Sequence, residues 1–491
     1  MENAILKFRE SLKNLPSVAA HQAIDTPDLR SIFTPKSHEK ALDPNCEIIV
    51  GDRGAGKSFW SSVLRDDAAR TAIAPIYPKL NLDKVTVCLG FSEALARAEY
   101  PSGNTIASLV KEFSDPAIIW RAVIFNSVSE PLLPKVWRGF SWTQKCDWVK
   151  NNSEKEEYTL SKFNQKLKSE NKRHLIVFDA LDRLGKDWQS IRSLSKSLLI
   201  TALQLRSFEH IRAKLFVRPD MESDREIWSF RDGSKLKQNI VNLNWDVKDL
   251  YGFVWHWFLS DSQVRSEFIK LVGENWPSEV GIGSAENLIK VPDVLLDNDL
   301  VQKEIVEGLA GNMMGAGSRK GHPYTWIPKH LADAKERVSL RSFIIALRDS
   351  ARATPSASKY ALAHSQIKSG VQQASKSRVE QLKEDYVWIE DVLNPLKGLS
   401  TPNSDKEFFT RWKANNTARK ILTSKVGDPN FLVPVEIEGL SETDPDIYLH
   451  LIESLKGIGV AERRADGRLN IPDLYQVASG MVRKGGVRPI R

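Results

Sequence analysis

Residues 46–64, CEIIVGDRGAGKSFWSSVL, predict a strand, a tight glycine loop and a helix in direct succession. The segment 47–50 is short and rich in β-branched residues, and 58–64 has the spacing of a helix. Between them, residues 51–58 fit the pattern G-x-x-x-x-G-K-[ST] at every fixed position. The glycines let successive backbone N–H groups point inward at phosphate oxygens, and the following helix presents its positive dipole end. The stretch therefore predicts a site that holds the phosphates of a nucleotide.

Each position of the loop has an expected part in this site. Lys57 is expected to reach the β- and γ-phosphates, and the Ser58 hydroxyl to bind Mg²⁺. The other residues that we expect to line the nucleotide are Gly51, Asp52, Arg53, Gly54, Ala55, Gly56 and Phe59.

A site of this kind needs a carboxylate on a neighbouring strand. The apolar run 175–178 reads as a strand buried on both faces and ends at Asp179, at the carboxyl edge of a parallel sheet. We expect Asp179 to orient the Mg²⁺ shell. Asp182 has a catalytic interpretation, in which it polarises the attacking water. Its structural alternatives are a helix N-cap for the run near Trp188 or an ion pair with Arg183.

A further strand, at 213–220, carries a second candidate. Arg218 would stand at the same sheet edge as Asp179, where it could sense a γ-phosphate, or it could pair with Asp220 or Glu222. Pro219 is expected to end this strand. More strands are predicted at 84–91 and 240–243, and a helix at 188–207. Strands that alternate with helices indicate an α/β fold, a P-loop NTPase parallel sheet with helices on both faces.

The motifs GDRGAGKS, LIVFDALDRL and LFVRPD, in this order, resemble those of P-loop ATPases of the AAA+/STAND group. The D-x-L-D-R form is similar to that of KAP-type NTPases within the group. The resemblance covers residues 45–245 and, more loosely, residues up to 360. It implies hydrolysis of ATP or GTP, usually ATP, and a switch between nucleotide states. The chain departs from KAP proteins in having no visible membrane segment, and from STAND proteins in having no visible repeats or effector.

The resemblance also implies a helical lid, which we place at 246–360 after a P-loop core at 45–245. Its first helix starts near 246, with Asp246 as the expected N-cap. In this family an arginine at the head of a lid helix often reaches the nucleotide phosphates, which makes Arg341 a sensor candidate and His330 a further one. The alternative for both is a residue on a helix surface.

The end of the chain is predicted to form a helical linker region, 361–425, and a winged-helix-like α+β domain, 426–491. A helix at 446–455 is followed by the Ala465-Asp466-Gly467 turn of a β-hairpin. In a DNA-binding interpretation, basic residues of the hairpin and tail neutralise phosphates. In the alternative, the domain docks a protein, because acidic residues dilute the charge. The basic residues are Arg463, Arg464, Arg468, Arg483, Lys484, Arg488 and Arg491.

The composition fits a well-folded cytoplasmic protein. The 491 residues are 41% hydrophobic and 27% charged, include 14 Trp, and carry a formal charge of +8. Residues 1–44 read as an N-terminal helical arm and lack the order of a signal peptide. No apolar run approaches the ~20 residues that span a bilayer. Cys46, Cys88 and Cys146 are too widely spaced to suggest a zinc site or a disulfide framework.

Three functions follow as hypotheses. The first is an ATP-binding and hydrolysing switch with Mg²⁺ that couples nucleotide state to a partner protein in a homo- or hetero-oligomer, where a neighbouring subunit could supply an arginine. By analogy with its family, such a switch could serve bacterial antiphage defence. The second is a DNA-binding ATPase, a loader or remodeller that grips nucleic acid with the C-terminal module. The third is a module that holds nucleotide without useful turnover. The sequence shows no nuclease, protease or deaminase motif.

Overall fold

The computed structural model describes residues 2–16, 22–185, 187–277, 288–315, 320–423 and 433–484. Arg488 and Arg491 of the predicted basic tail lie outside these residues. Within the described ranges, every helix is too short or too polar to cross a membrane.

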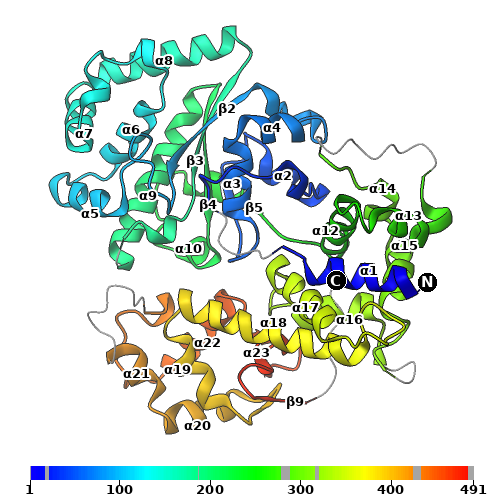
Figure 1. Cartoon of the computed structure of the whole chain (residues 1–491). Helices are drawn as coiled ribbons and strands as arrows, with labels where there is room; N and C mark the ends of the chain where they lie inside the picture. The colour runs from blue at the N-terminus through cyan, green and yellow to red at the C-terminus, as the bar shows by residue number, and fades with distance from the viewer. Residues whose placement is uncertain are drawn as a thin grey trace.

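A five-stranded parallel sheet forms the centre of the N-terminal half (Figure 1). Its strands pair in the order β2-β3-β4-β1-β5. Helices lie on both faces of the sheet, as the sequence predicts. The apolar runs at 48–50 and 175–178 are buried on both faces, which explains their continuous hydrophobicity. The bounds are β1 Ile48–Val50, β2 Val85–Phe91, β3 Arg173–Phe178, β4 Ile211–Val217 and β5 Val241–Asn242.

The helix predicted at 188–207 is present as α9, Trp188–Gln204, followed by a 3₁₀ turn. Asp187 caps it by accepting a hydrogen bond from the backbone N–H of Ser190. The suggestion that Asp182 caps this helix is therefore wrong, because a carboxylate nearer the first turn fills that position. The other helices of this half are α2 Glu39–Leu42, α3 Lys57–Arg65, α4 Asp67–Ile73, α5 Gly103–Glu112, α6 Ala117–Asn126, α7 Trp142–Asn151, α8 Ser153–Ser169, α10 Pro219–Ser223 and α11 Gly233–Lys237.

A helical region follows the sheet, as predicted. Asp246 stands at the N-cap position of α12, as predicted, although its side chain makes no capping hydrogen bond to the described backbone. The longest described helix, α18, crosses the molecule between the sheet and the C-terminal module (Figure 1). The bounds are α12 Val247–Ser260, α13 Arg265–Val272, α14 Asp293–Asp297, α15 Asp299–Ala310, α16 Pro323–Leu331, α17 Leu340–Ala353 and α18 His364–Asp385.

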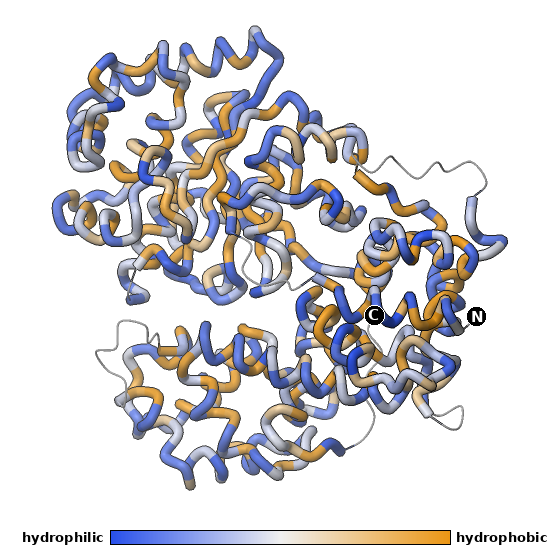
Figure 2. The backbone as a smooth tube through the Cα atoms, in the orientation of Figure 1, coloured by the Kyte–Doolittle hydropathy of each residue, from blue (hydrophilic) through white to orange (hydrophobic). Residues whose placement is uncertain are grey.

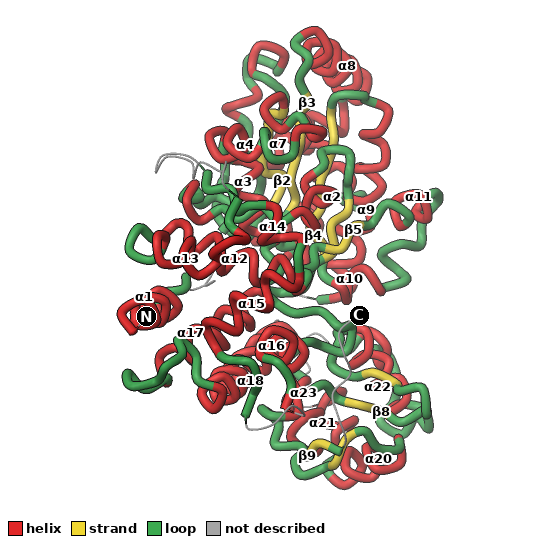
Figure 3. The backbone as a smooth tube through the Cα atoms, turned by 90° about the vertical axis from the view of Figure 1, so that its right-hand side faces the viewer, coloured by secondary structure: helices red, strands yellow, loops and turns green. Residues whose placement is uncertain are grey.

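The C-terminal module consists of short helices and the predicted hairpin, in which β7 and β8 pair antiparallel around Gly467. Figure 3 shows β8 and β9 in the lower part of the molecule, well away from the large sheet. A second small pair, β6 with β9, is parallel. The bounds are α19 Ile389–Leu393, α20 Asp405–Ala414, α21 Thr417–Thr423, α22 Ile447–Gly457, α23 Asp473–Gln476, β6 Ser400–Thr401, β7 Glu462–Arg463, β8 Leu469–Asn470 and β9 Val482–Arg483.

The buried apolar side chains gather in two clusters. One surrounds the sheet and contains described residues between 23 and 243, and the other joins the helical region to the C-terminal module. Figure 2 shows the apolar stretches running along the strands and through the interior of the helical part. The N-terminal helix α1, Glu2–Lys13, packs on the second cluster through Phe8 and Leu12. Its buried Arg9 donates hydrogen bonds to the carbonyls of Ser358 and Tyr360. The proposed domain boundaries stay a prediction.

Candidate nucleotide site

The predicted loop connects β1 to α3 and has the shape that its glycines allow. Gly54 and Gly56 adopt positive φ angles of 82° and 105°, which side chains other than glycine rarely take. The indole N–H of Trp245 donates a hydrogen bond of 2.9 Å to the carbonyl of Ala55 and so helps to fix the loop. The helix α3 begins at Lys57, directly after the loop. Backbone N–H groups at such a helix start are free of intrahelical partners and suit an anion.

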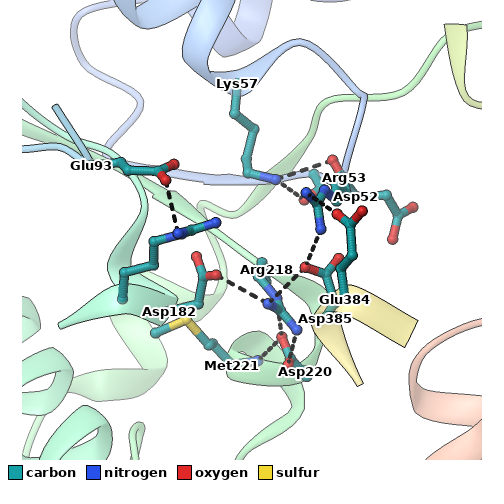
Figure 4. Close-up of polar contacts among 12 residues, drawn as sticks. Asp52, Arg53, Lys57, Glu93, Asp182, Arg218, Asp220, Met221, Glu384 and Asp385 are labelled. Carbon is teal, nitrogen blue, oxygen red and sulfur yellow. Dashed lines mark hydrogen bonds and ion pairs between the residues drawn. The ribbon is translucent and has the colours of Figure 1, made fainter. Parts of the chain in front are cut away.

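Lys57 folds back over the loop. Its ammonium donates hydrogen bonds of 2.6 Å to the carbonyl of Gly51 and 3.1 Å to that of Asp52 (Figure 4). Burial lowers the pKa of Lys57, and the charges of Asp179, Asp182 and Asp52 oppose that effect. A desolvated ammonium next to the loop is stabilised when an anionic ligand pairs with it.

Asp179 lies at the end of β3 and is 2% exposed. Asp179 lines the same cavity as Ser58 and Lys57 of the loop, so the loop and the acid face one another. Burial raises the pKa of Asp179, while Ser58 and Lys57 work against that rise. The expectation of a neighbouring strand is wrong in detail, because β4 lies between β1 and β3. The acid still reaches the loop because all three parallel strands end at the same edge.

The chain turns sharply after Asp179. Ala180 has φ 56° and ψ 39°, a left-handed conformation that is uncommon for a residue with a Cβ and marks a strained turn. The following 3₁₀ turn, Leu181–Arg183, brings the side chain of Asp182 to the same side of the sheet as Asp179. Burial alone would raise the pKa of Asp182, but Arg218 and Lys57 outweigh it, and the pKa is lowered. Asp182 therefore stays ionised.

Arg218 pairs with carboxylates from three segments. It lies 3.0 Å from Asp182, 2.8 Å from Asp220 and 3.7 Å from Asp385 (Figure 4). Of the alternatives considered from sequence, pairing with Asp220 is confirmed. The suggested pair between Asp182 and Arg183 is wrong, because Arg183 points to Glu93 at 2.8 Å. A role of Arg218 in sensing phosphate stays a prediction.

The two lid candidates separate in the structure. Arg341, in the first turn of α17, packs against the loop: a Cβ built on Gly54 would lie 3.3 Å from the Cβ of Arg341. Burial and the nearby charges of Arg53 and Arg378 lower its pKa. The ring of His330 instead stacks on Trp326, its Nδ1 donates a hydrogen bond to the Trp326 carbonyl, and its Nε2 lies 3.5 Å from Asp473 of the C-terminal module. The geometry thus keeps Arg341 beside the loop and places His330 elsewhere.

These side chains surround one open cavity of about 450 Å³, a size typical of small-ligand sites. Five basic and five acidic side chains are among its described lining. The residues that line it are Asp52, Arg53, Gly54, Gly56, Lys57, Ser58, Phe59, Glu93, Asp179, Ala180, Asp182, Arg183, Arg218, Arg341 and Asp385.

The donor set fits Mg²⁺ better than a softer metal. Among the described residues, no three His, Cys, Asp or Glu side chains gather as a metal cluster. Mg²⁺ is usually held by one or two carboxylates together with phosphates and waters, so it does not need such a cluster. Asp179 and the Ser58 hydroxyl, which line the same cavity, would supply one carboxylate and one hydroxyl ligand.

Residues of the C-terminal half form ion pairs with the loop, which was not predicted from the sequence. Asp52 pairs with Arg337 at 2.9 Å, and Arg337 pairs with Asp333 at 2.8 Å. Arg53 pairs with Glu384 at 2.6 Å and with Asp385 at 2.8 Å. A signal for the second contact exists in the sequence. Two acids in the last turn of a helix oppose the helix dipole, which suggests partners outside the helix.

The predicted wing carries fewer free arginines than its sequence suggests. Arg463 lies 2.7 Å from Asp405, Arg468 lies 2.7 Å from Asp466, and Arg483 lies 2.8 Å from Asp473. Each pair offsets a charge that a DNA phosphate would need.

Comparison with known proteins gives distant likenesses in structure. No family model matches the sequence, and no curated protein matches it. The Aeropyrum pernix ORC2 protein, solved as ADPNP-ADP complexes, is 12% identical at a TM-score of 0.36, covering 88% of this chain and 86% of that one. The Walker-type ATPase paby2304 of Pyrococcus abyssi is 12% identical at 0.37, covering 91% and 99%. The Aeropyrum pernix ORC1 protein in complex with DNA is 12% identical at 0.33, covering 92% and 94%. At these values, the function has to be argued from the site.

Proposed function

We propose that the protein binds ATP with Mg²⁺, hydrolyses it, and uses the nucleotide state to change how its C-terminal half is held. The observation that carries the proposal is the common cavity lined by Lys57 and Ser58 of the loop and by the buried carboxylate of Asp179. A glycine loop, a lysine and a buried carboxylate thus line one cavity, which supports a site for a nucleotide and its metal.

In this proposal the loop backbone and Lys57 bind the β- and γ-phosphates, and Asp179 with Ser58 holds the metal. The metal, when bound, neutralises charge on the phosphate oxygens. Asp182, kept ionised by Arg218, is placed to orient the water that attacks the γ-phosphorus. The bond between the γ-phosphorus and the bridging oxygen breaks as water adds in line, giving ADP and phosphate. Positioning and charge neutralisation supply the catalysis, because the protein has little covalent chemistry to perform.

The wider role follows from the grip on the loop. Asp52 and Arg53 are loop residues whose side chains reach the C-terminal half. A ligand that binds the loop therefore acts on those pairs, and the C-terminal module would present a changed surface to a partner protein. An arginine from a neighbouring subunit would complete a site that is open on one side. ATP is chosen over GTP because of the resemblance to ATPases.

The test is turnover by the purified protein, with any co-purifying partner, in the presence and absence of duplex DNA. The switch proposal expects Mg²⁺-dependent phosphate release that a partner protein raises and DNA leaves unchanged. The competing DNA-binding ATPase expects stimulation by DNA that fades as salt rises. The ion pairs of the wing arginines favour the first outcome. Tight nucleotide binding without any turnover would instead support a nucleotide-holding module.

A further inference from the structure

The end of α18 reaches into the nucleotide cavity. Asp385, the last residue of the helix, lines the same cavity as Lys57, Ser58 and Asp179 and is 16% exposed at its side chain. The adjacent Glu384 points outward, with 61% of its side chain exposed, and is not part of the described lining. The two neighbours thus pair with the same arginine, Arg53, but differ in where their charge lies.

Asp385 is placed between two cations of the site. Its carboxylate lies 2.8 Å from Arg53 of the loop and 3.7 Å from Arg218 after β4 (Figure 4). Those arginines would attract a terminal phosphate in its absence. A carboxylate that already pairs with both competes with that phosphate and repels it.

Asp385 differs from the other acids of the described lining in its attachment. Asp52, Glu93, Asp179 and Asp182 belong to the loop or to segments that follow strands of the large sheet, so they stay with the site. Asp385 belongs to a helix whose apolar residues pack in the second hydrophobic cluster. It can therefore withdraw without unfolding the sheet, whereas the others cannot.

We propose that Asp385 is a latch that competes with the terminal phosphate of the nucleotide, so that a bound triphosphate detaches the end of α18 from Arg53 and Arg218. This inference rests on the proposed nucleotide site. A nucleoside diphosphate lacks the γ-phosphate that competes with Asp385, so it leaves the latch closed.

The latch is connected to the C-terminal module through side chains on and just after α18. Ser375 of α18 donates a hydrogen bond to the carbonyl of Leu474 in α23. Beyond Asp385, the ring of Tyr386 lies 4.9 Å from the guanidinium carbon of Arg218, and Tyr386 contacts Trp388. Release of Asp385 would disturb this set of contacts. Linkage requires the effect to be reciprocal: the factor by which a bound triphosphate weakens the attachment of α18 is the factor by which an attached α18 weakens triphosphate binding.

The experiment compares Asp385→Asn with Glu384→Gln in the full chain, measuring dissociation constants for fluorescent ATP and ADP analogues with Mg²⁺. Both variants remove one charge beside Arg53, but Asp385→Asn alone removes it from the cavity lining. We expect Asp385→Asn to tighten ATP binding about fivefold or more and ADP binding by less than twofold, a coupling of ordinary size. Glu384→Gln is expected to leave the ratio of ATP to ADP affinity within twofold of wild type.

Equal tightening for ATP and ADP, weaker ATP binding, or an equal effect of Glu384→Gln would overturn the latch. A second measurement on the wild-type protein does not depend on variant folding: hydrogen exchange at residues 378–388 should rise with a non-hydrolysable ATP analogue and stay unchanged with ADP. Unchanged exchange with the bound analogue would also overturn it. Failure of the nucleotide site itself looks different, because the wild-type protein would then bind neither analogue.

Discussion

Replacing Arg337 with methionine tests how firmly the C-terminal half holds the loop. Arg337 is 15% exposed and lies between two carboxylates, Asp52 at 18% and Asp333 at 4% exposure. The substitution keeps the length of the aliphatic stem and removes both ion pairs. It leaves Asp333 without its cation in a site where burial already raises the pKa of that carboxyl.

The magnitude follows from the burial of the pair. Removing one partner of a buried ion pair costs about 3–5 kcal/mol, and the partial exposure of Asp52 puts our expectation near ~3 kcal/mol. The loss should depend on pH. Without Arg337, the folded-state pKa of Asp333 rises further, so the protonated acid fits the folded state better than the charged one. The deficit is therefore largest at neutral pH and shrinks as the pH falls through that raised pKa.

Hydrogen exchange under native conditions is the suitable assay, because it reports the stability of each helix and strand separately. Protection in α17 and α18 should fall in Arg337→Met, and protection in the sheet should stay. The control is Arg138→Met, which breaks an exposed pair with Glu130 and should cost about 1 kcal/mol or less. If α18 in Arg337→Met were as well protected from exchange at neutral pH as it is in the wild-type protein, the reasoning would be refuted.

Three further predictions concern packing, titration and catalysis. In Gly370→Ala the new Cβ would lie 2.2 Å from the carbonyl oxygen of Ala346, so the folded state should lose about 1–3 kcal/mol of stability and the melting temperature should drop. The control, Gly457→Ala, should not lower the melting temperature, because no described atom lies within 4 Å of its Cβ position. Burial raises the pKa of Asp249 to about 6, so the protonated form that suits the folded state is lost as the pH rises through 6. In urea unfolding, Asp249→Asn should therefore be up to about 3 kcal/mol more stable than wild type above pH 6 and as stable as wild type near pH 4. Asp182→Asn should lower kcat by about 100-fold or more with a less than threefold change in ATP affinity, and a parallel loss of both would mark Asp182 as structural.

The sheet and the loop could be predicted because their signals are local. Each strand is a short apolar run, and the pattern from Gly51 to Ser58 needs its residues at fixed spacing. The sequence also predicted that Asp179 follows the carboxyl end of its strand, which is confirmed. It could not give the strand order, because the pairing of β4 between β1 and β3 depends on side-chain packing across distant segments.

The contacts between the two halves could not be predicted either, because they join residues that are distant in the sequence. Arg53 and Asp385 are separated by 332 positions, and no short pattern links them. Asp182 pairs with Arg218, 36 positions away, and not with the adjacent Arg183, so nearness in the sequence indicated the wrong partner. The catalytic role of Asp182 stays a prediction. The partner of Arg463, Asp405, lies 58 positions away, so the hairpin sequence could not indicate that pair.

Calorimetric titration of Mg²⁺-ATP into the wild-type protein and Lys57→Ala addresses the nucleotide site most directly. Lys57 is expected to make charge-assisted hydrogen bonds to phosphate, worth about 1.5–3 kcal/mol, so its loss should weaken ATP binding by about 10–150-fold. Lys111→Ala, which removes an exposed lysine, should bind as wild type does. Equal ATP affinity in Lys57→Ala and wild type, or no binding by the wild-type protein, would contradict the assignment of this cavity.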